Sequence, residues 1–207
     1  MSLWSSFRVS WQALKTRRKM NRQFGKREDP FSSSTTPYEA ARLKTLETAL
    51  GAGNLESALE AGCAEGHFTE RLVRRVRQVT ALDISAVAIE RAQKRAPGAV
   101  FVEADLMTWE PSSKAAYDAI VLGDVLYYLD RPGVAAEYAA LFAKISSWLK
   151  SGGRLLLAHG FAGDKELAHR RSFRERFEKT GLKLISEAPI AGVERGGVRC
   201  LLSVLER

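Results

Sequence analysis

The alternation of apolar and polar positions along the chain predicts both strands and helices. Short apolar runs that suit buried strands lie near residues 58–61, 79–83, 101–103, 117–122, 153–159, 182–188 and 198–205. Apolar residues that recur every three or four positions predict helices over residues 3–19, 38–50, 133–150 and 164–179. The last two strands are joined by a glycine-rich turn at Gly192, Gly196 and Gly197. This pattern indicates an α/β domain with helices on both faces of one sheet.

The stretch from Ala58 to Phe68 carries the clearest functional signal. An apolar run containing Glu60 leads into a loop with Gly62 and Gly66, and a helical pattern begins at Phe68. A strand that turns sharply into a helix needs small residues, because the backbone tightens and a ligand must approach it closely. We therefore expect a nucleotide-like cofactor at the carboxyl end of this strand, against the helix N-terminus.

The spacing of this loop separates two kinds of cofactor site. The dinucleotide fingerprint requires glycine at the positions held by Gly62, Ala64 and His67, and two of these fail. The acidic-x-Gly-x-Gly-x-Gly loop of class I S-adenosylmethionine (SAM) methyltransferases fits better, since Glu60, Gly62 and Gly66 match and only Ala64 departs. The stretch therefore resembles methyltransferase motif I.

Three later strands also end in a carboxylate. Asp83 ends the second strand, where it can accept hydrogen bonds from both ribose hydroxyls. Asp105 follows the third strand and resembles the family's acid that accepts a hydrogen bond from the adenine amino group. Asp124 follows the fourth strand, on the acceptor side. The resemblance implies a Rossmann-like, seven-stranded, mostly parallel sheet with a C-terminal antiparallel hairpin. The residues expected to bind SAM are Glu60, Gly62, Cys63, Ala64, Gly66, Asp83, Ile84, Ala104, Asp105, Leu106, Gly123 and Tyr38.

Two further stretches resemble a narrower group, the NodS-like methyltransferases. These are Asp29-Pro30-Phe31 with Thr36-Pro37-Tyr38-Glu39, and Leu126-Tyr127-Tyr128-Leu129. The resemblance covers residues 29–207 and implies N-methylation of an amino group on a small-molecule or oligosaccharide acceptor, with Phe31 and Tyr38 helping to close the site. O-methylation of a natural-product hydroxyl remains an alternative, as does RNA binding or RNA methylation.

The candidate catalytic residues are Asp124, His159 and Tyr128. Asp124 could orient an acceptor amine, or take its proton if burial raises its pKa, or contact only the amino group of SAM. His159 ends a strand and is either a general base with a near-neutral pKa or a structural residue. Only one of Tyr127 and Tyr128 is expected to face the site, because neighbouring residues on a helix point apart. Of the other two histidines, His67 is expected to be a bystander, and His169 is a weaker candidate for contact with the acceptor.

The charge of the chain changes the interpretation of its N-terminus. Residues 1–28 hold eight Lys or Arg and one acid, which is +7 of the total net charge of +8. Leu3, Phe7, Trp11 and Leu14 form an apolar stripe, and residues 20–37 are expected to be a polar connector. We expect a basic amphipathic helix or lid over residues 1–28 and the catalytic domain over residues 29–207. The helix packs on the body or acts as a mobile lid, and nucleic acid or lipid is the alternative partner.

The two cysteines, Cys63 and Cys200, form neither a disulfide framework nor a metal-ligand spacing. No apolar run approaches the length of a membrane span. These observations favour a cytoplasmic enzyme without a metal ion.

Overall fold

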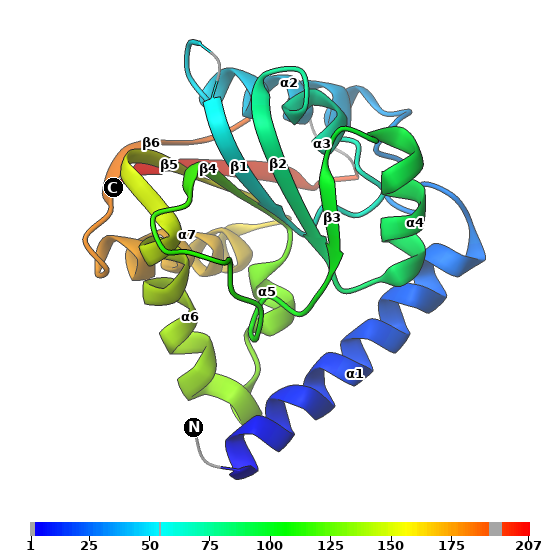
Figure 1. Cartoon of the computed structure of the whole chain (residues 1–207), viewed down its shortest axis with the longest axis vertical. Coiled ribbons are helices and arrows are strands. Elements are labelled where there is room, and N and C mark those ends of the chain that lie inside the picture. The colour runs from blue at the N-terminus through cyan, green and yellow to red at the C-terminus, as the bar shows by residue number, and fades with distance from the viewer. Residues whose placement is uncertain (1–2, 54, 191–195) are drawn as a thin grey trace.

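The computed structural model describes residues 3–53, 55–190 and 196–207. One seven-stranded sheet lies at the centre, in the order β3-β2-β1-β4-β5-β7-β6 (Figure 1). Its strands are β1 (Leu55–Ala61), β2 (Val76–Asp83), β3 (Val100–Glu103), β4 (Tyr117–Gly123), β5 (Leu149–Phe161), β6 (Lys183–Pro189) and β7 (Arg199–Glu206). The first five strands pair in parallel, whereas β7 runs antiparallel to both β5 and β6. The expected mostly parallel sheet with a C-terminal hairpin is confirmed; Gly192 of the connecting turn lies outside the described residues.

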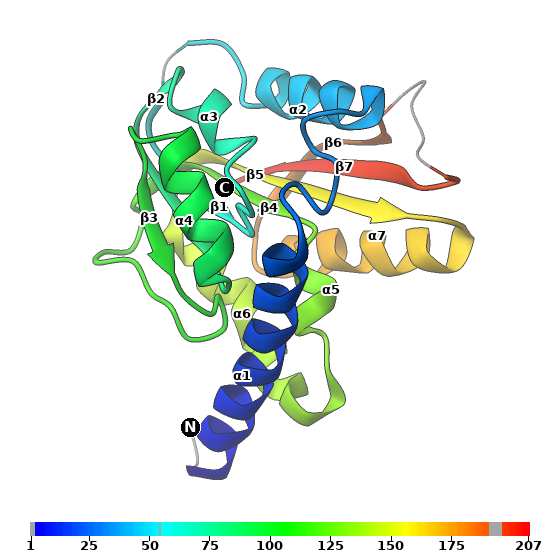
Figure 2. The ribbon, with the colours of Figure 1, turned by 90° about the vertical axis from the view of Figure 1, so that its right-hand side faces the viewer.

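Helices cover both faces of the sheet (Figure 2). On one face lie α2 (Pro37–Ala49) and the single turn α3 (Thr69–Leu72), with α4 (Ala86–Arg95) beside them toward β3. On the other face lie α5 (Leu126–Leu129), the 3₁₀ turn η1 (Pro132–Val134), α6 (Ala135–Trp148) and α7 (Asp164–Glu178). The long helix α1 (Leu3–Lys26) crosses the edge of this assembly.

The period-two pattern of the strands divides the core into two layers. Leu59 and Ile120 point toward α6 and α7, where they join Phe142 and Phe177. Their neighbours Ala58, Ala119 and Val121 point to the opposite layer with the apolar residues of α2. Since successive side chains of a strand alternate between faces, each buried strand serves both layers and reads as a continuous apolar run.

The strand order reverses between β1 and β4. From β1 the chain moves outward through β2 to β3, and it then returns to place β4 on the other side of β1. In open α/β sheets the crevice at such a reversal, at the carboxyl ends of the strands, is where ligands bind. The fold therefore directs the ends of β1, β2 and β4 toward one position.

Several predicted boundaries differ from the structure. The helix expected over residues 3–19 extends to Lys26, because Met20 and Phe24 continue its buried side. The helix expected to reach residue 150 ends at Trp148, and β5 begins at Leu149, which pairs with Tyr117. The helix expected over residues 38–50 begins one residue earlier, at Pro37, because Thr36 caps α2 by accepting a hydrogen bond from the Glu39 amide.

The buried face of α1 is not the predicted one. Phe7 and Trp11 are 63% and 50% exposed, while Val9, Met20 and Phe24 are buried; the side chain of Leu3 lies outside the described part. Val9, Met20 and Phe24 are spaced by eleven and four residues, which places them on one side of a helix. Phe7 and Trp11 of the hydrophobic stripe read from the sequence therefore face solvent, and Leu14 is half-buried. Within the described residues, no helix has the length and apolarity needed to cross a membrane.

The position of Phe24 generates a stability prediction. We expect Phe24→Ala to lower the free energy of unfolding by about 3 kcal/mol, because it removes a buried ring and leaves a cavity. Phe7→Ala, the matched change on the exposed face, should alter it by less than about 0.5 kcal/mol. Urea unfolding of both variants measures the difference. Equal losses would show that the buried face of α1 has been assigned wrongly.

Candidate active site

A cavity of about 450 Å³ lies where the strand order reverses. Its floor is formed by the ends of β1, β2 and β4, and its walls by α2, the tyrosines of α5 and the inner face of α1. The volume falls in the range of small-molecule sites. The sheet thus brings residues that are far apart in sequence to one enclosed position.

The carboxylate of Glu60 is buried at the end of β1. Thr69 donates a hydrogen bond from its hydroxyl to Glu60 Oε2 at 2.6 Å. Burial raises the pKa of Glu60 to about 7, because the hydroxyl bond compensates only part of the lost hydration. At neutral pH this carboxyl group therefore lies close to its titration point and would gain from a cationic neighbour.

Asp83 is the last residue of β2, and Asp105 lies two residues after the end of β3. Asp83 accepts hydrogen bonds from the amides of Ala64 at 3.0 Å and Ser85 at 2.8 Å. Asp105 accepts one from the amide of Met107 at 3.0 Å. Burial raises the pKa of both carboxyl groups, so the amide donors do not fully replace water. Both line the cavity and are ready to accept hydrogen bonds from a ligand.

The loop after β1 adopts left-handed backbone conformations at Gly62, Ala64 and Gly66, with φ of 82°, 48° and 79°. A Cβ on Gly62 would lie 3.0 Å from the carbonyl oxygen of Gly123, and one on Gly66 would lie 3.0 Å from the Cβ of Ala92. Gly66 thus permits close packing against α4 and does not line the cavity, which corrects its predicted role beside the ligand. Ala64 takes the same kind of conformation in spite of its Cβ.

The opposite end of the cavity is organised around Asp124, which follows β4 with φ of 51°. Its Oδ2 accepts from Arg42 at 2.8 Å, and its Oδ1 accepts from the Gly160 amide at 2.8 Å and the Tyr127 hydroxyl at 3.2 Å. Burial works to raise the pKa of Asp124, but Arg42, His159 and the hydrogen bonds together lower it. The raised pKa that a proton-accepting role would need is therefore absent, and Asp124 is a fixed carboxylate.

Arg42 connects this carboxylate to α2. Its guanidinium also donates to Glu39 at 3.1 Å, one helical turn away, and both side chains are largely buried. Burial opposes the charge of Arg42, but Asp124 and Glu39 hold its pKa well above the usual value. One cation thus lies between two acids and fixes the geometry of Asp124.

Both tyrosines of α5 line the cavity, although only one was expected to do so. The helix is a single turn, and the Tyr127 and Tyr128 rings contact each other with centroids 4.6 Å apart. The guanidinium carbon of Arg170 lies 4.4 Å from the Tyr127 ring centroid, and the ammonium of Lys19 lies 5.4 Å from that of Tyr128. The pair therefore forms a continuous aromatic wall beside Asp124.

His159 is buried away from the cavity. It is 1% exposed, is packed between the rings of Tyr127 and Phe173, and does not line the cavity. Burial lowers its pKa to about 3, so it is neutral throughout the physiological range. His169 pairs with Asp130 at 2.9 Å, outside the cavity. Of the two alternatives for His159, its burial and lowered pKa favour the structural residue over the general base.

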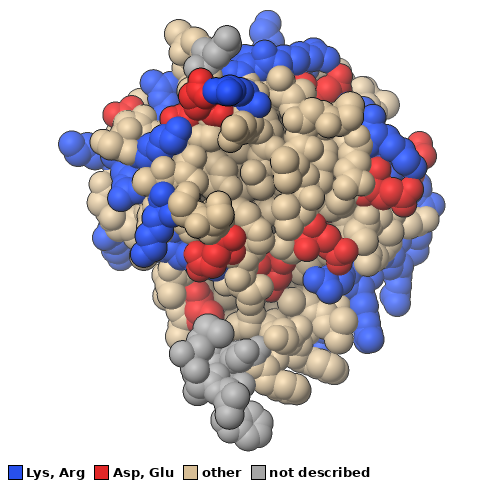
Figure 3. Space-filling model, in the orientation of Figure 1, with Lys and Arg blue, Asp and Glu red and all other residues tan. Residues whose placement is uncertain are grey.

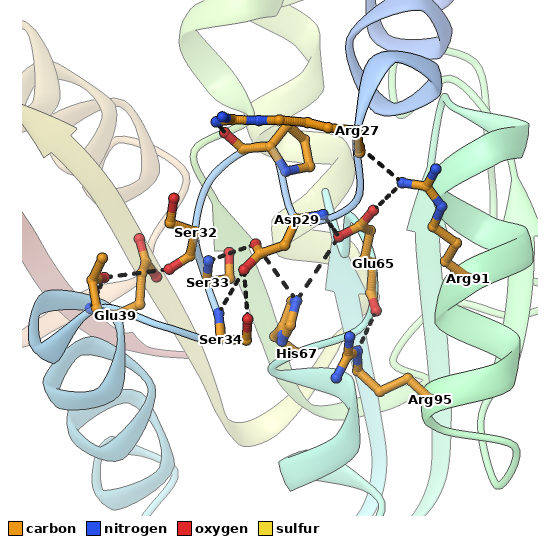
Figure 4. A network of polar contacts seen from close by, with 12 residues as sticks. Arg27, Asp29, Ser32, Ser33, Ser34, Glu39, Glu65, His67, Arg91 and Arg95 are labelled. Atoms are coloured by element: carbon orange, nitrogen blue, oxygen red, sulfur yellow. Dashed lines mark hydrogen bonds and ion pairs between the residues drawn. The ribbon is translucent and has the colours of Figure 1, made fainter.

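A polar cluster fastens the connector between α1 and α2 to the loop after β1 (Figure 4). Glu65 accepts a hydrogen bond from the Asp29 amide at 2.8 Å and pairs with Arg91 of α4. Asp29 in turn accepts from the amides of Ser33 and Ser34. The cluster closes the cavity on the side of Phe31, whose ring packs edge-on against Phe24.

His67 belongs to the same cluster. Its Nε2 lies 3.8 Å from Asp29 Oδ1 and 4.0 Å from Glu65 Oε2, so the three residues have a spacing that can suit a metal ion. All four carboxylate oxygens already accept hydrogen bonds from Arg91, Asp29 or the Ser33–Ser34 segment. The group therefore holds the connector between α1 and α2 against the loop after β1. His67, which was expected to be a bystander, also lines the cavity.

Comparison with known proteins identifies the family. The family model for nodulation protein S (NodS) matches residues 15–167, which is most of the chain. The chain belongs to the NodS family. Nodulation protein S of Rhizobium tropici is 34% identical over 133 residues, covering 62% of this chain and 54% of that protein. The Sinorhizobium fredii protein is 33% identical over 129 residues, covering 60% and 58%. The chain thus matches little more than half the length of these curated relatives.

Other similarities extend beyond this family. Trans-aconitate 2-methyltransferase of Rhizobium etli is 30% identical over 145 residues, covering 66% of this chain and 54% of that protein. Among solved structures, the N-methyltransferase NodS of Bradyrhizobium japonicum with S-adenosyl-L-homocysteine superposes with a TM-score of 0.78. That match covers 93% of this chain and 98% of the other at 24% identity, which establishes the shared fold.

The cavity of this NodS-family chain gathers nearly all residues selected from the sequence. Gly66 and His159 are the exceptions among the candidate cofactor and catalytic residues. The candidate residues that do line the cavity are Tyr38, Glu60, Gly62, Cys63, Ala64, Asp83, Ile84, Ala104, Asp105, Leu106, Gly123, Asp124 and Tyr128.

Several cavity residues supplied by helices were not among the candidate site residues. Arg42, Glu39, Met20 and Phe24 all line the cavity, but none belongs to a strand-end motif. The pair Glu39–Arg42 has the i, i+3 spacing of a helical ion pair, which by itself is usually a solvated surface feature. Only its burial distinguishes it, and burial follows from the tertiary structure.

The conformation of Ala64 gives a prediction for the loop. A left-handed conformation disfavours any residue with a Cβ by about 1–2 kcal/mol, so Ala64→Gly should raise the free energy of unfolding by up to about 1 kcal/mol after the entropy of glycine is counted. Ala61→Gly, three residues earlier in β1, should lower it by about 1 kcal/mol. Chemical denaturation compares the two. A destabilising Ala64→Gly would contradict the assigned backbone strain.

Proposed function

We propose that this chain is an SAM-dependent methyltransferase that transfers a methyl group to an amine of a small-molecule or oligosaccharide acceptor. One observation carries the proposal. Of the carboxylates at or just after strand ends that face this cavity, Glu60, Asp83 and Asp105 have a raised pKa, whereas Asp124 is paired with Arg42 and has a lowered pKa; this difference divides the cavity into a cofactor end and an acceptor end.

The residues of the cofactor end suit SAM. Its ammonium group would supply the positive charge that Glu60 lacks, and ribose hydroxyls and the adenine amino group would supply donors to Asp83 and Asp105. Gly62 and Ala64 bring backbone close to the ligand. When bound, SAM provides an electrophilic methyl group on a sulfonium. We propose that α1, which contributes Met20 and Phe24 to the wall, acts as a lid over it.

The acceptor end supports an amine. An amine attacks through its own lone pair and needs orientation more than a strong base. Asp124 Oδ2 receives a single described hydrogen bond, from Arg42, and retains a lone pair for an acceptor N–H. Burial and Asp124 raise the pKa of Tyr127, so its hydroxyl stays protonated and continues to donate to Asp124. The aromatic wall excludes water from the transfer.

Methylation of a hydroxyl is less well supported. A hydroxyl group must lose its proton as it attacks, and the two bases considered for that step were Asp124 and His159. The pKa of each is lowered, and His159 lies behind the wall of the cavity. The described similarity to a protein named as an N-methyltransferase agrees with the amine. We also propose a cytoplasmic location, supported by the free state of Cys63 and Cys200.

Calorimetric titration with S-adenosylhomocysteine tests the cofactor, with NAD as the control ligand. Because the ammonium group favours ionised Glu60, and because its pKa in the free protein is about 7, binding below that pH requires Glu60 to lose a proton. Affinity should therefore fall by about tenfold between pH 8 and pH 6. Absence of binding to S-adenosylhomocysteine, or equal binding of NAD, would refute the cofactor assignment.

The matched control for this titration is Glu60→Gln. The amide cannot ionise, so its binding should be weaker at pH 8 and nearly independent of pH over the same interval. A variant that keeps the full pH dependence would show that another group titrates.

Asp124→Asn tests the acceptor end. The amide retains the shape of the side chain but loses the charge that orients an N–H donor, so kcat/KM for a chitooligosaccharide with one free amino group should fall on the order of 100-fold. Affinity for S-adenosylhomocysteine should change less than about threefold. Asp130→Asn, outside the cavity, is the control. Unchanged methyl transfer by Asp124→Asn would remove Asp124 from the acceptor site.

A further inference from the structure

The side of α1 that faces away from the protein body carries a concentrated positive charge. Within the described residues, none of its cations has an acidic partner; the ion pair of α1 with the body is made by Arg17, which bonds to Glu103 from another side of the helix. Blue side chains gather at the lower right of Figure 3, over the position of α1 in Figure 1. We call this surface the outer face of α1, and it consists of Phe7, Arg8, Trp11, Lys15, Arg18, Lys19, Arg22 and Lys26.

Packing forces these residues outward. Val9, Met20 and Phe24 bind α1 to the body, and they occupy the opposite side of the helix. At 100° per residue the members of the outer face span roughly 120° of the helix circumference. The chain therefore holds one continuous basic strip in solvent along a helix of 24 residues.

Two aromatic residues share that strip. Phe7 and Trp11 lie one turn apart, and both are at least half exposed. The ammonium of Lys15 lies 5.2 Å from the Trp11 ring centroid. Both occur in the N-terminal half of α1, which extends below the sheet in Figures 1 and 2. Exposed apolar rings next to unpaired cations indicate a binding surface.

We propose that the outer face of α1 binds membranes containing anionic phospholipids, with the helix lying along the headgroup layer. Lys and Arg would be attracted by the negative surface potential, and Phe7 and Trp11 would enter the interface between headgroups and acyl chains. This inference does not depend on the proposed function. It places the protein on a membrane surface, in agreement with the absence of a membrane-spanning helix from the described residues.

The arrangement of the strip favours a membrane over a nucleic acid. In proteins that bind single strands, aromatic side chains recur along the path of the backbone so that successive bases can stack. Here both rings lie at one end of the outer face, and Lys15, Arg18, Arg22 and Lys26 follow without another ring among them. A straight, convex surface with an aromatic end fits a plane of anionic headgroups.

Membrane binding through the outer face of α1 would place the cavity close to the lipid surface, because the inner face of the same helix forms part of the cavity wall. Met20 and Phe24 line the cavity, and Lys19 of the outer face lies over Tyr128, which also lines it. The cavity is therefore one helix diameter away from the proposed lipid surface.

Co-sedimentation of the full chain with vesicles tests the proposal. One set of vesicles contains phosphatidylcholine alone, and the other contains 30% phosphatidylserine. With about 1 kcal/mol of attraction per cation near an anionic surface, binding to the anionic vesicles at low salt should exceed binding to neutral ones at least on the order of 100-fold. Binding should fall by more than about tenfold at 0.5 M NaCl, because salt screens exposed charges.

Matched charge variants locate the contact. Arg18→Gln/Arg22→Gln/Lys26→Gln should weaken anionic-vesicle binding on the order of 100-fold. Arg77→Gln/Lys179→Gln/Lys183→Gln removes the same charge from exposed positions on β2, directly after α7 and at the start of β6, and should weaken it less than about threefold. Trp11→Ala should weaken it about tenfold through lost apolar burial. Thermal unfolding of each variant verifies that it is folded.

Three outcomes would overturn the proposal. The first is no preference of the wild-type chain for anionic vesicles at low salt. The second is an equal loss in the two triple variants, which would indicate attraction by net charge alone. The third is tighter binding to a 20-nucleotide single-stranded RNA than to the vesicles under the same conditions, which would assign the outer face of α1 to nucleic acid.

Discussion

Four carboxylates at or just after strand ends face one small cavity in this protein, and of these four Asp124 alone is paired with the buried cation Arg42. Arg42 neutralises that acid and leaves Glu60, Asp83 and Asp105 with amide or hydroxyl donors alone. Burial consequently raises the pKa of those three, while that of Asp124 is lowered. The division of the cavity into two ends thus depends on one guanidinium group, positioned by a helix that precedes the whole sheet.

Strand-end acids could be found from the sequence because their position follows from local pattern. An apolar run ends, a carboxylate comes next, and parallel strands bring such ends to one edge. Glu60, Asp83, Asp105 and Asp124 were all located in this way and all line the cavity. Arg42 could not be, since its partner is 82 positions away and its own helix shows nothing unusual at that position. The sequence pattern predicts which side chains lie at the end of a strand, but it does not predict which helix packs over that strand end.

The buried face of the N-terminal helix α1 was also not predictable from its apolar pattern alone. Phe7 and Trp11 form a more conspicuous apolar stripe than Val9, Met20 and Phe24, yet the second stripe is the buried one. The first stripe shares its side of the helix with six cations, whose burial without partners would cost far more than burying two rings would return. Charge, more than hydrophobicity, selects the face of this helix. An apolar stripe therefore has to be read together with the charges that lie beside it.

Tertiary hydrogen bonds also explain why the loop after β1 keeps a backbone conformation that is locally unfavourable for Ala64. Ala64 holds a backbone conformation that glycine adopts more readily, at a position where motif I has glycine. The Ala64 amide donates a hydrogen bond to Asp83, and the next residue, Glu65, accepts hydrogen bonds from the Asp29 amide and from Arg91. Those bonds fix the loop on both sides of the strained residue, so a single methyl group can be tolerated there. The connector that carries Asp29 therefore supports the loop after β1, although Asp29 and Glu65 are 36 residues apart in sequence.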